Sequence, residues 1–97
     1  MLSIKNSVAV ITGGSGGIGK TLAELWLTRG GKVVIADIME DALASAENEL
    51  RKISPDVVGC FCNVTSEKEN SKLARFAIEK FGAINLIAPF AGITSDG

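Results

Sequence analysis

The chain has 97 residues and a net charge of −1, with 46% apolar and 22% charged residues. A chain of this length forms at most one small domain. Its charge balance provides no basic surface for nucleic acid or an anionic membrane. No apolar run is long enough for a transmembrane helix. The N-terminus lacks the charged and apolar regions of a signal peptide, so we expect a cytoplasmic protein without nucleic-acid or membrane partners.

The first predicted elements are a buried strand, a glycine-rich turn and a helix. Residues 8–11 are apolar and mostly β-branched, which favours a strand. The helix begins near Ile18, and its apolar residues predict one buried face made of Ile18, Leu22, Leu25 and Trp26. Glycines in the turn allow a tight reversal and the close approach of a phosphate to backbone N–H groups. The helix N-terminus then holds the anion.

Two nucleotide-binding patterns overlap in this turn. From Thr12, the sequence Thr-Gly-x-x-x-Gly-x-Gly is a looser relative of the dinucleotide fingerprint. From Gly14, it satisfies the P-loop pattern G-x-x-x-x-G-K-[ST], in which Lys20 contacts phosphates and Thr21 contacts magnesium. Both patterns place a phosphate at the same helix end, and they differ in whether Lys20 and Thr21 face it. A glycine-rich turn without a ligand is the third interpretation.

The rest of the chain alternates between strands and helices. We expect further strands over 32–37, 57–62 and 84–90, and helices over 41–53 and 66–81. Ser66 and Glu69 have the spacing of a capping box at the start of the last helix. Strands that alternate with helices pair in parallel through right-handed crossovers. Strands that are apolar on both faces require helices on both sides of the sheet. The predicted fold class is therefore an α/β, Rossmann-type doubly wound parallel sheet that stops after the fourth strand.

Two cysteines, Cys60 and Cys62, lie in the third predicted strand, and the chain has no histidine. A C-x-C pair without histidine partners is a poor zinc site, so we expect no metal. At positions i and i+2 of a strand, both thiols point to the same face, which we expect to be the core.

Asp37 ends the second predicted strand and lies 24 residues after Gly13. In a dinucleotide fold, an acid at this position hydrogen-bonds the adenosine ribose and repels a 2′-phosphate, which favours NAD over NADP. In the P-loop interpretation, the same residue is the magnesium-binding aspartate at the end of a strand.

The sequence resembles the short-chain dehydrogenase/reductase family over essentially its whole length. The motifs that carry the resemblance are Thr12-Gly13-x-x-x-Gly17-Ile18-Gly19, the NAD-type acid Asp37, the adenine-contacting segment Asn63-Val64-Thr65, and Ala91-Gly92-Ile93-Thr94-x-Asp96. The last two motifs look like those of 3-oxoacyl-carrier-protein reductases. The resemblance implies the strand order 3-2-1-4 and NAD as the cofactor. The residues that it implies for cofactor binding are Gly13, Ser15, Gly16, Gly17, Ile18, Gly19, Asp37, Ile38, Asn63, Val64, Ala91 and Gly92.

The chain departs from the family pattern in two places. Pro89 and Phe90 stand where the family has two asparagines, one near the cofactor ribose and one that braces the sheet. The family's catalytic serine, tyrosine and lysine lie downstream of this segment, and the chain has no tyrosine. The tyrosine is the family's general acid/base, and no histidine is present to replace it. The resemblance thus implies that residues 1–97 are the dinucleotide-binding half-domain of an oxidoreductase for a secondary alcohol, ketone or 3-oxoacyl substrate, inactive alone and without catalytic residues of its own.

Three other functions stay open: a non-catalytic module that binds NAD, a P-loop nucleotide hydrolase, and a fragment that serves to associate with other chains. In the 3-2-1-4 order the fourth strand lies at the edge of the sheet. Its residues are apolar (Ile84, Leu86, Ile87 and Ala88), and only Pro89 weakens it as a pairing edge. We therefore expect a homo-oligomer, or association with the remainder of a longer chain.

Overall fold

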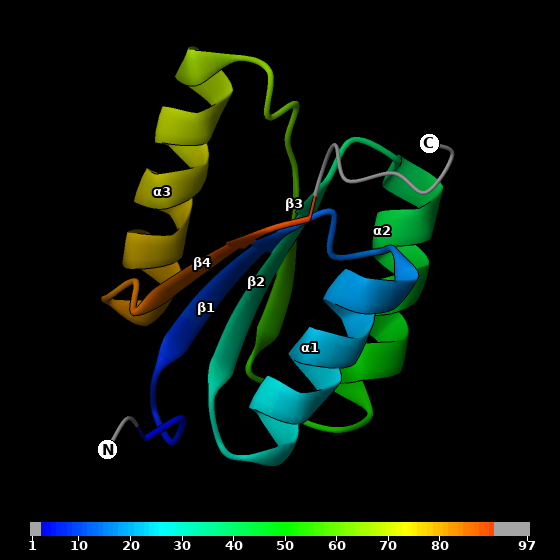
Figure 1. Cartoon of the computed structure of the whole chain (residues 1–97), viewed down its shortest axis with the longest axis vertical. Helices are drawn as coiled ribbons and strands as arrows, with labels where there is room; N and C mark the ends of the chain where they lie inside the picture. Colours follow the sequence, from blue (N-terminus) through cyan, green and yellow to red (C-terminus); the bar gives the residue numbers. More distant parts are fainter. Residues whose placement is uncertain (1–2, 91–97) are drawn as a thin grey trace.

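A computed structural model describes residues 3–90 as one parallel sheet with helices on both of its faces (Figure 1). The strand order is β3-β2-β1-β4. In chain order the elements are β1 (Val8–Thr12), α1 (Gly17–Thr28), β2 (Lys32–Asp37), α2 (Glu40–Arg51), β3 (Val57–Phe61), α3 (Glu67–Phe81) and β4 (Leu86–Pro89). The predicted fold class and strand order are confirmed.

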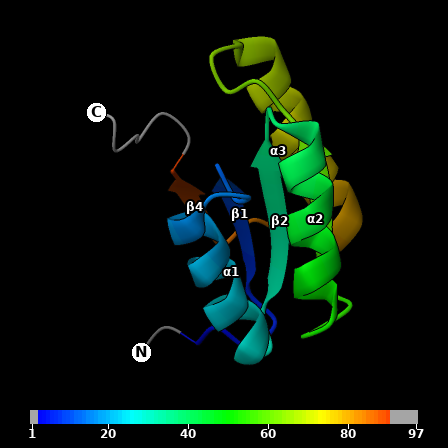
Figure 2. The ribbon, with the colours of Figure 1, turned by 90° about the vertical axis from the view of Figure 1, so that its right-hand side faces the viewer.

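The sheet separates two apolar cores. Helices α1 and α2 cover one face, and α3 covers the other (Figures 1 and 2). All five residues of β1 are buried, because helices lie on both sides of this central strand. The side chains of Ile11 and Ile35 are fully buried on the α1 and α2 side, and Val10 and Val34 are buried on the α3 side. Among the described residues, no helix is long and apolar enough to cross a membrane.

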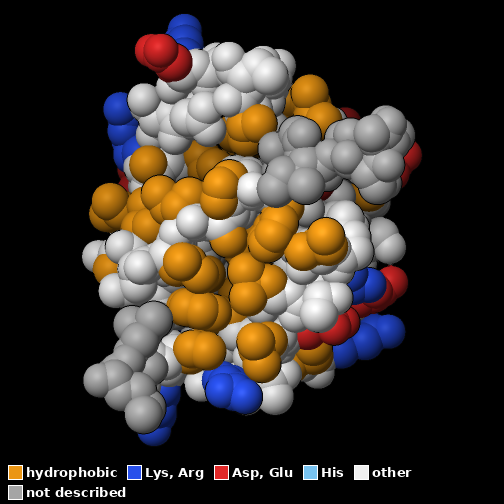
Figure 3. Space-filling view, viewed as in Figure 1, with side chains coloured by type: hydrophobic (Ala, Val, Ile, Leu, Met, Phe, Trp, Pro, Cys, Tyr) orange, Lys and Arg blue, Asp and Glu red, His pale blue; other side chains and the backbone are white. Residues whose placement is uncertain are grey.

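The buried face of α1 matches the prediction only in part: Trp26 is buried and Leu22 packs against the core as predicted, but Ile18 and Leu25 are not buried. The buried residues of this helix are Gly19, Ala23, Trp26 and Leu27, whereas Ile18 is 66% and Leu25 is 44% exposed. The reason is the close packing at Gly19, where a Cβ atom would come within 2.6 Å of the Gly13 carbonyl oxygen. Since this glycine must face the turn, the helix is rotated so that Ile18 and Leu25 point outward. They add to the apolar side chains that gather on the β4 side of the molecule (Figure 3).

Three predicted elements are shorter than expected. Helix α2 ends at Arg51 rather than residue 53, because the Ile53 amide turns back to the Leu50 carbonyl in a tight turn. Strand β4 begins at Leu86, and Asn85 before it bonds to Val8 through both backbone and side chain. The Asn85 amide donates to the Val8 carbonyl at 2.8 Å, and the Asn85 Oδ1 atom accepts a hydrogen bond from the Val8 amide at 2.8 Å. Strand β3 ends at Phe61, one residue before the predicted end, although the Cys62 amide still donates to the Asp37 carbonyl of β2.

The predicted capping box at the start of α3 is only half formed. The Ser66 hydroxyl accepts a hydrogen bond from the Glu69 amide at 3.3 Å, as expected for an N-cap. The Glu69 carboxylate does not return to Ser66 but accepts from the Asn63 amide at 2.7 Å. The Ser66 amide donates to the Asn63 carbonyl instead, so Glu69 is free to brace the loop that follows β3.

Candidate functional site

The glycine-rich turn after β1 lies directly against the end of β2. Gly13 adopts a φ of 74°, a left-handed conformation that favours glycine. The amides of Gly13 and Gly14 both donate to the Ala36 carbonyl, at 2.7 and 3.2 Å. A Cβ atom at Gly14 would lie 2.7 Å from the side chain of Ile35. The turn therefore requires glycine both for its conformation and for its contact with β2.

Helix α1 begins without any side-chain cap. Its N-cap residue is Gly16, and its first turn contains no acidic residue. The first turns of α2 and α3 each contain two acidic residues. A Cβ atom added at Gly17 would meet no protein atom within 4 Å, so the backbone here faces open space. Uncapped N–H groups at the positive end of a helix dipole can bind an anion, and Gly17 leaves the approach to them clear.

Lys20 and Thr21, the two residues specific to the P-loop pattern, are engaged elsewhere. The Lys20 ammonium forms an ion pair with Glu49 of α2. The Thr21 hydroxyl donates to the Gly17 carbonyl at 2.8 Å, one turn back in its own helix. Because neither side chain is directed to the turn, the geometry favours the dinucleotide pattern over the P-loop pattern.

Asp37 is held between the turn and the loop after β2. One carboxylate oxygen accepts hydrogen bonds from the amide and the hydroxyl of Ser15, and the other accepts from the Met39 amide at 3.1 Å. A carboxylate has about four acceptor positions, so three donors leave room for a further hydroxyl group. The sequence indicated Ser15 and Asp37 as separate ligand contacts, and the structure joins them in one hydrogen-bonded unit.

The third predicted segment forms a turn beyond β3. The Asn63 side-chain oxygen accepts from the amide and the hydroxyl of Thr65, at 3.0 and 2.7 Å. Val64 packs against the core on the α3 side. Because parallel strands end at the same edge of a sheet, the glycine turn, Asp37 and Asn63 follow neighbouring strand ends. The other two predicted contacts, Ala91 and Gly92, lie outside the described residues.

A hollow beside Asp37 is lined by Ile38, which the sequence analysis named, and by residues such as Met39 and Phe61, which it did not. It has a volume of about 440 Å³, and Ile38, Met39 and Phe61 line it together with the start of α2. Phe61 is 51% exposed although it is aromatic. The signal that could have identified Phe61 is strand alternation, which directs it to the face opposite Cys60 and Cys62.

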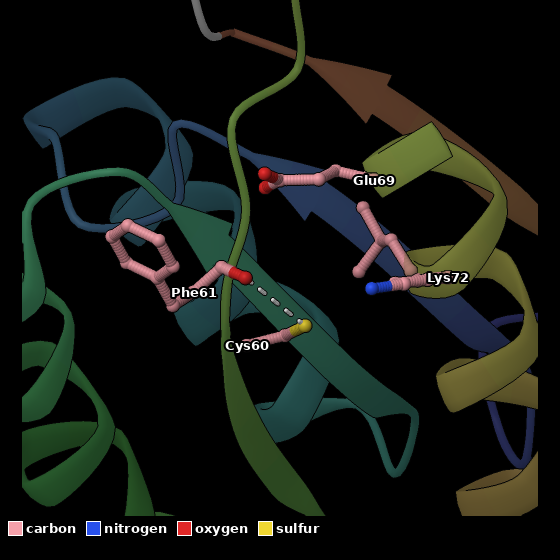
Figure 4. Close-up of a pocket in the computed structure, with 5 residues that line it drawn as sticks. Cys60, Phe61, Glu69 and Lys72 are labelled. Carbon is pink, nitrogen blue, oxygen red and sulfur yellow. Dashed lines mark hydrogen bonds between the residues drawn. The ribbon is translucent and has the colours of Figure 1, made fainter. Parts of the chain in front are cut away.

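The two cysteines face the core on the α3 side, as predicted from their spacing, and both are free thiols. Cys60 lies in a small hollow beside Glu69 and Lys72 of α3, and Phe61 points away from it (Figure 4). Burial, and then the charge of Glu69, raise the pKa of the Cys60 thiol. Burial raises the pKa of Cys62 as well, with smaller effects of Cys60 and Glu69. Since reactivity requires the thiolate, neither cysteine has the environment of a nucleophile. Within residues 3–90, no three metal-ligating side chains form a group.

Comparisons with known proteins agree with this geometry. The family model for short chain dehydrogenases matches residues 7–97. The 7alpha-hydroxysteroid dehydrogenase of Escherichia coli (strain K12) is 38% identical over 91 residues, which are 94% of this chain and 36% of that protein. The chain therefore spans about a third of the length of the curated relatives that it matches.

Solved structures show the same similarity. A short chain dehydrogenase/reductase from Burkholderia phymatum in complex with NAD has a TM-score of 0.87 and 37% identity, over 90% of this chain and 31% of that one. A 7 alpha-hydroxysteroid dehydrogenase complexed with NADH and 7-oxo glycochenodeoxycholic acid has a TM-score of 0.83 and 38% identity, over 88% and 33% of the two chains.

Proposed function

The chain belongs to the short-chain dehydrogenase/reductase family, and we propose that residues 1–97 form the NAD-binding half of an oxidoreductase. The observation that carries this proposal is the pairing of an uncapped, glycine-lined helix start with a fixed carboxylate at the next strand end. In such enzymes the nicotinamide supplies the hydride chemistry, while the protein binds and orients the cofactor.

Each part of the dinucleotide has a proposed set of contacts. The pyrophosphate would meet backbone N–H groups from Ser15 to Ile18, and Gly13 and Gly19 would set the turn that presents them. The Asp37 carboxylate would accept a hydrogen bond from the adenosine ribose. The adenine would lie beside Ile38 and the Asn63-Val64 turn. Gly16, Ala91 and Gly92 complete the proposed set of cofactor contacts.

The proposed substrate is a secondary alcohol, a ketone or a 3-oxoacyl compound. The sequence contains neither tyrosine nor histidine, so this chain has no residue suited to act as general acid/base at neutral pH. We therefore propose that these 97 residues bind the cofactor but do not catalyse the reaction alone. Because the sequence has neither tyrosine nor histidine, a purely non-catalytic NAD-binding module is the second candidate function.

Direct titration of the purified chain tests the proposed function. We expect NAD to bind more tightly than NADP, ATP with magnesium to bind weakly, and no turnover of NADH with ketones. Calorimetric titration with the three nucleotides measures the order of affinities, and absorbance at the NADH band measures turnover. Tight ATP–magnesium binding without NAD binding would contradict the proposal, and turnover by this chain would contradict the absence of catalysis.

Lys20→Ala is expected to leave NAD affinity within about twofold, a difference well below 1 kcal/mol. The reason is that Lys20 pairs with Glu49 on α2 and does not face the turn. The variant should lose no more than about 1 kcal/mol of stability, because the pair is partly exposed. The same titration checks affinity, and loss of strong ATP–magnesium binding in this variant would instead support the P-loop assignment.

A further inference from the structure

Strand β3 lies at one edge of the sheet and consists of residues that favour pairing with a further strand. Residues 57–62 have the sequence Val-Val-Gly-Cys-Phe-Cys, which contains no charged residue and no proline. Edge strands are commonly kept from pairing with other strands by lysine, proline or another charged residue within the strand. A short uncharged segment at an edge is otherwise a place where aggregation begins. Since β3 has none of these protective residues, its protection has to come from another element.

Every second residue of β3 directs its backbone groups away from the sheet. Within the described part of the chain, β3 pairs only with β2. The Asp56 carbonyl accepts a hydrogen bond from the Val33 amide, and the Cys62 amide donates to the Asp37 carbonyl, so the even-numbered residues of this stretch face β2. Because backbone groups alternate in direction along a strand, three residues of β3 face the outer edge with their N–H and C=O groups: Val57, Gly59 and Phe61.

Side chains of α2 occupy two of these outward groups. The Glu47 carboxylate accepts a hydrogen bond from the Gly59 amide at 3.0 Å, and the Arg51 guanidinium donates to the Val57 carbonyl at 2.9 Å. Glu47 and Arg51, one helical turn apart, also pair with each other at 2.8 Å. A Cβ atom at Gly59 would lie 3.2 Å from Glu47 Oε1 and 3.3 Å from the Leu43 side chain. The glycine in this strand therefore leaves the space in which α2 approaches the edge.

The two occupied groups are those that a neighbouring strand would use. In a parallel ladder, one residue of the neighbour donates to a carbonyl and accepts from the amide two residues further along. Arg51 and Glu47 make this pair of bonds with Val57 and Gly59. In an antiparallel ladder, the same two groups belong to two successive hydrogen-bonded residue pairs, and each pair would lose one bond. The two side chains therefore oppose a new strand in either direction.

We propose that the Glu47–Arg51 pair takes the place of a neighbouring strand residue and keeps β3 from pairing with another polypeptide. An incoming strand has to break the ion pair and both of its bonds to the backbone before it can use this part of the edge. The outward groups that remain beyond Gly59 are its own carbonyl and the Phe61 amide. They provide one contact at the end of the strand, which is too little to hold a further strand.

Removal of the pair tests this protection. The double variant Glu47→Ala with Arg51→Ala uncovers both backbone groups and leaves the net charge unchanged. The matched control, Lys20→Ala with Glu49→Ala, removes the ion pair between α1 and α2 and also keeps the net charge. We expect the first variant to aggregate at least about tenfold faster than the wild type, because two backbone bonds become available to an incoming strand.

The control should aggregate at the rate of the wild type. Thioflavin fluorescence and light scattering at equal protein concentrations measure the rate of aggregation, and circular dichroism checks that each variant is folded. Association through any other surface is common to all three proteins, so the difference between the two double variants reports on β3.

Hydrogen exchange in the wild type tests the cover without a double variant. The Gly59 and Phe61 amides face the same edge, and of these two only the Gly59 amide has a hydrogen-bond acceptor in the described part of the chain. The Gly59 amide should therefore exchange at least about tenfold more slowly than the Phe61 amide. Glu47→Gln keeps an acceptor oxygen and should retain this difference, whereas Glu47→Ala should lose it.

Three results would overturn the proposal. Equal exchange at Gly59 and Phe61 in the wild type would show that the carboxylate does not cover the edge. A folded Glu47→Ala, Arg51→Ala variant that aggregates no faster than the control would show that the pair does not protect β3, and equal acceleration in both double variants would assign the effect to the loss of an ion pair. If the first double variant does not fold, Arg51→Ala replaces it, with Lys20→Ala as the control of equal charge change, and the same comparison decides.

Discussion

Replacing Gly17 with valine is expected to abolish NAD binding while the chain stays folded. A side chain at this position meets no protein atom within 4 Å, so it would extend into the space where the anion approaches α1. A hydrogen bond to a charged group contributes about 1.5–3 kcal/mol, and loss of two such bonds weakens binding by more than about 100-fold. Calorimetric titration measures the affinity, and thermal unfolding checks that the fold is retained.

Two control variants separate a blocked site from a damaged helix. Thr21→Val places the same side chain one turn later in α1, where the Thr21 hydroxyl bonds to the Gly17 carbonyl of its own helix, and should leave affinity unchanged. Gly19→Ala should instead destabilise the fold, because its Cβ atom would lie 2.6 Å from the Gly13 carbonyl oxygen. If Gly17→Val binds NAD as tightly as the wild type does, the phosphate does not lie at this helix start.

The fold could be predicted because two kinds of local pattern agree. Short β-branched runs and longer amphipathic segments alternate regularly, and this alternation determines parallel pairing. The rotation of α1 could not be predicted, because apolar spacing alone suggested that Ile18 and Leu25 are buried. The structure exposes both, since Gly19 must contact the turn and a helix cannot bury two different faces against one sheet.

In the candidate site, too, some features could be predicted from the sequence and others could not. The positions of Gly13 in the turn and of Asp37 at a strand end could be predicted from sequence, because they depend on chain conformation and on where a strand ends. The hydrogen bonds between Ser15 and Asp37 join residues in two different loops, and no spacing rule specifies such a contact. Two side chains of α2 also bond to the backbone of β3: Glu47 accepts from the Gly59 amide and Arg51 donates to the Val57 carbonyl, and the sequence analysis did not predict either bond for a related reason. The charges of an amphipathic helix predict solvent exposure and do not show which backbone groups lie within reach.

Asp37→Ala is expected to weaken NAD binding by about 10–100-fold and to narrow the preference for NAD over NADP. The variant removes an acceptor for a ribose hydroxyl, which reduces NAD affinity. It also removes a negative charge that would repel the 2′-phosphate of NADP, so NADP affinity falls less or rises. Parallel titrations with NAD and NADP give both affinities, and their ratio is the quantity that reports on the carboxylate.

Two further variants assign the effect to the charge of Asp37 rather than to its internal contacts. Asp37→Asn keeps an oxygen acceptor without the charge, so it should narrow the NAD preference while losing less NAD affinity than the alanine variant. Ser15→Ala removes the hydroxyl donor to Asp37 but leaves the charge in place, so the preference for NAD should persist. A wild-type chain that binds NADP at least as tightly as NAD would show that Asp37 does not determine cofactor choice. The same conclusion would follow if Ser15→Ala lost the preference as completely as Asp37→Ala, because the turn and not the charge would then decide it.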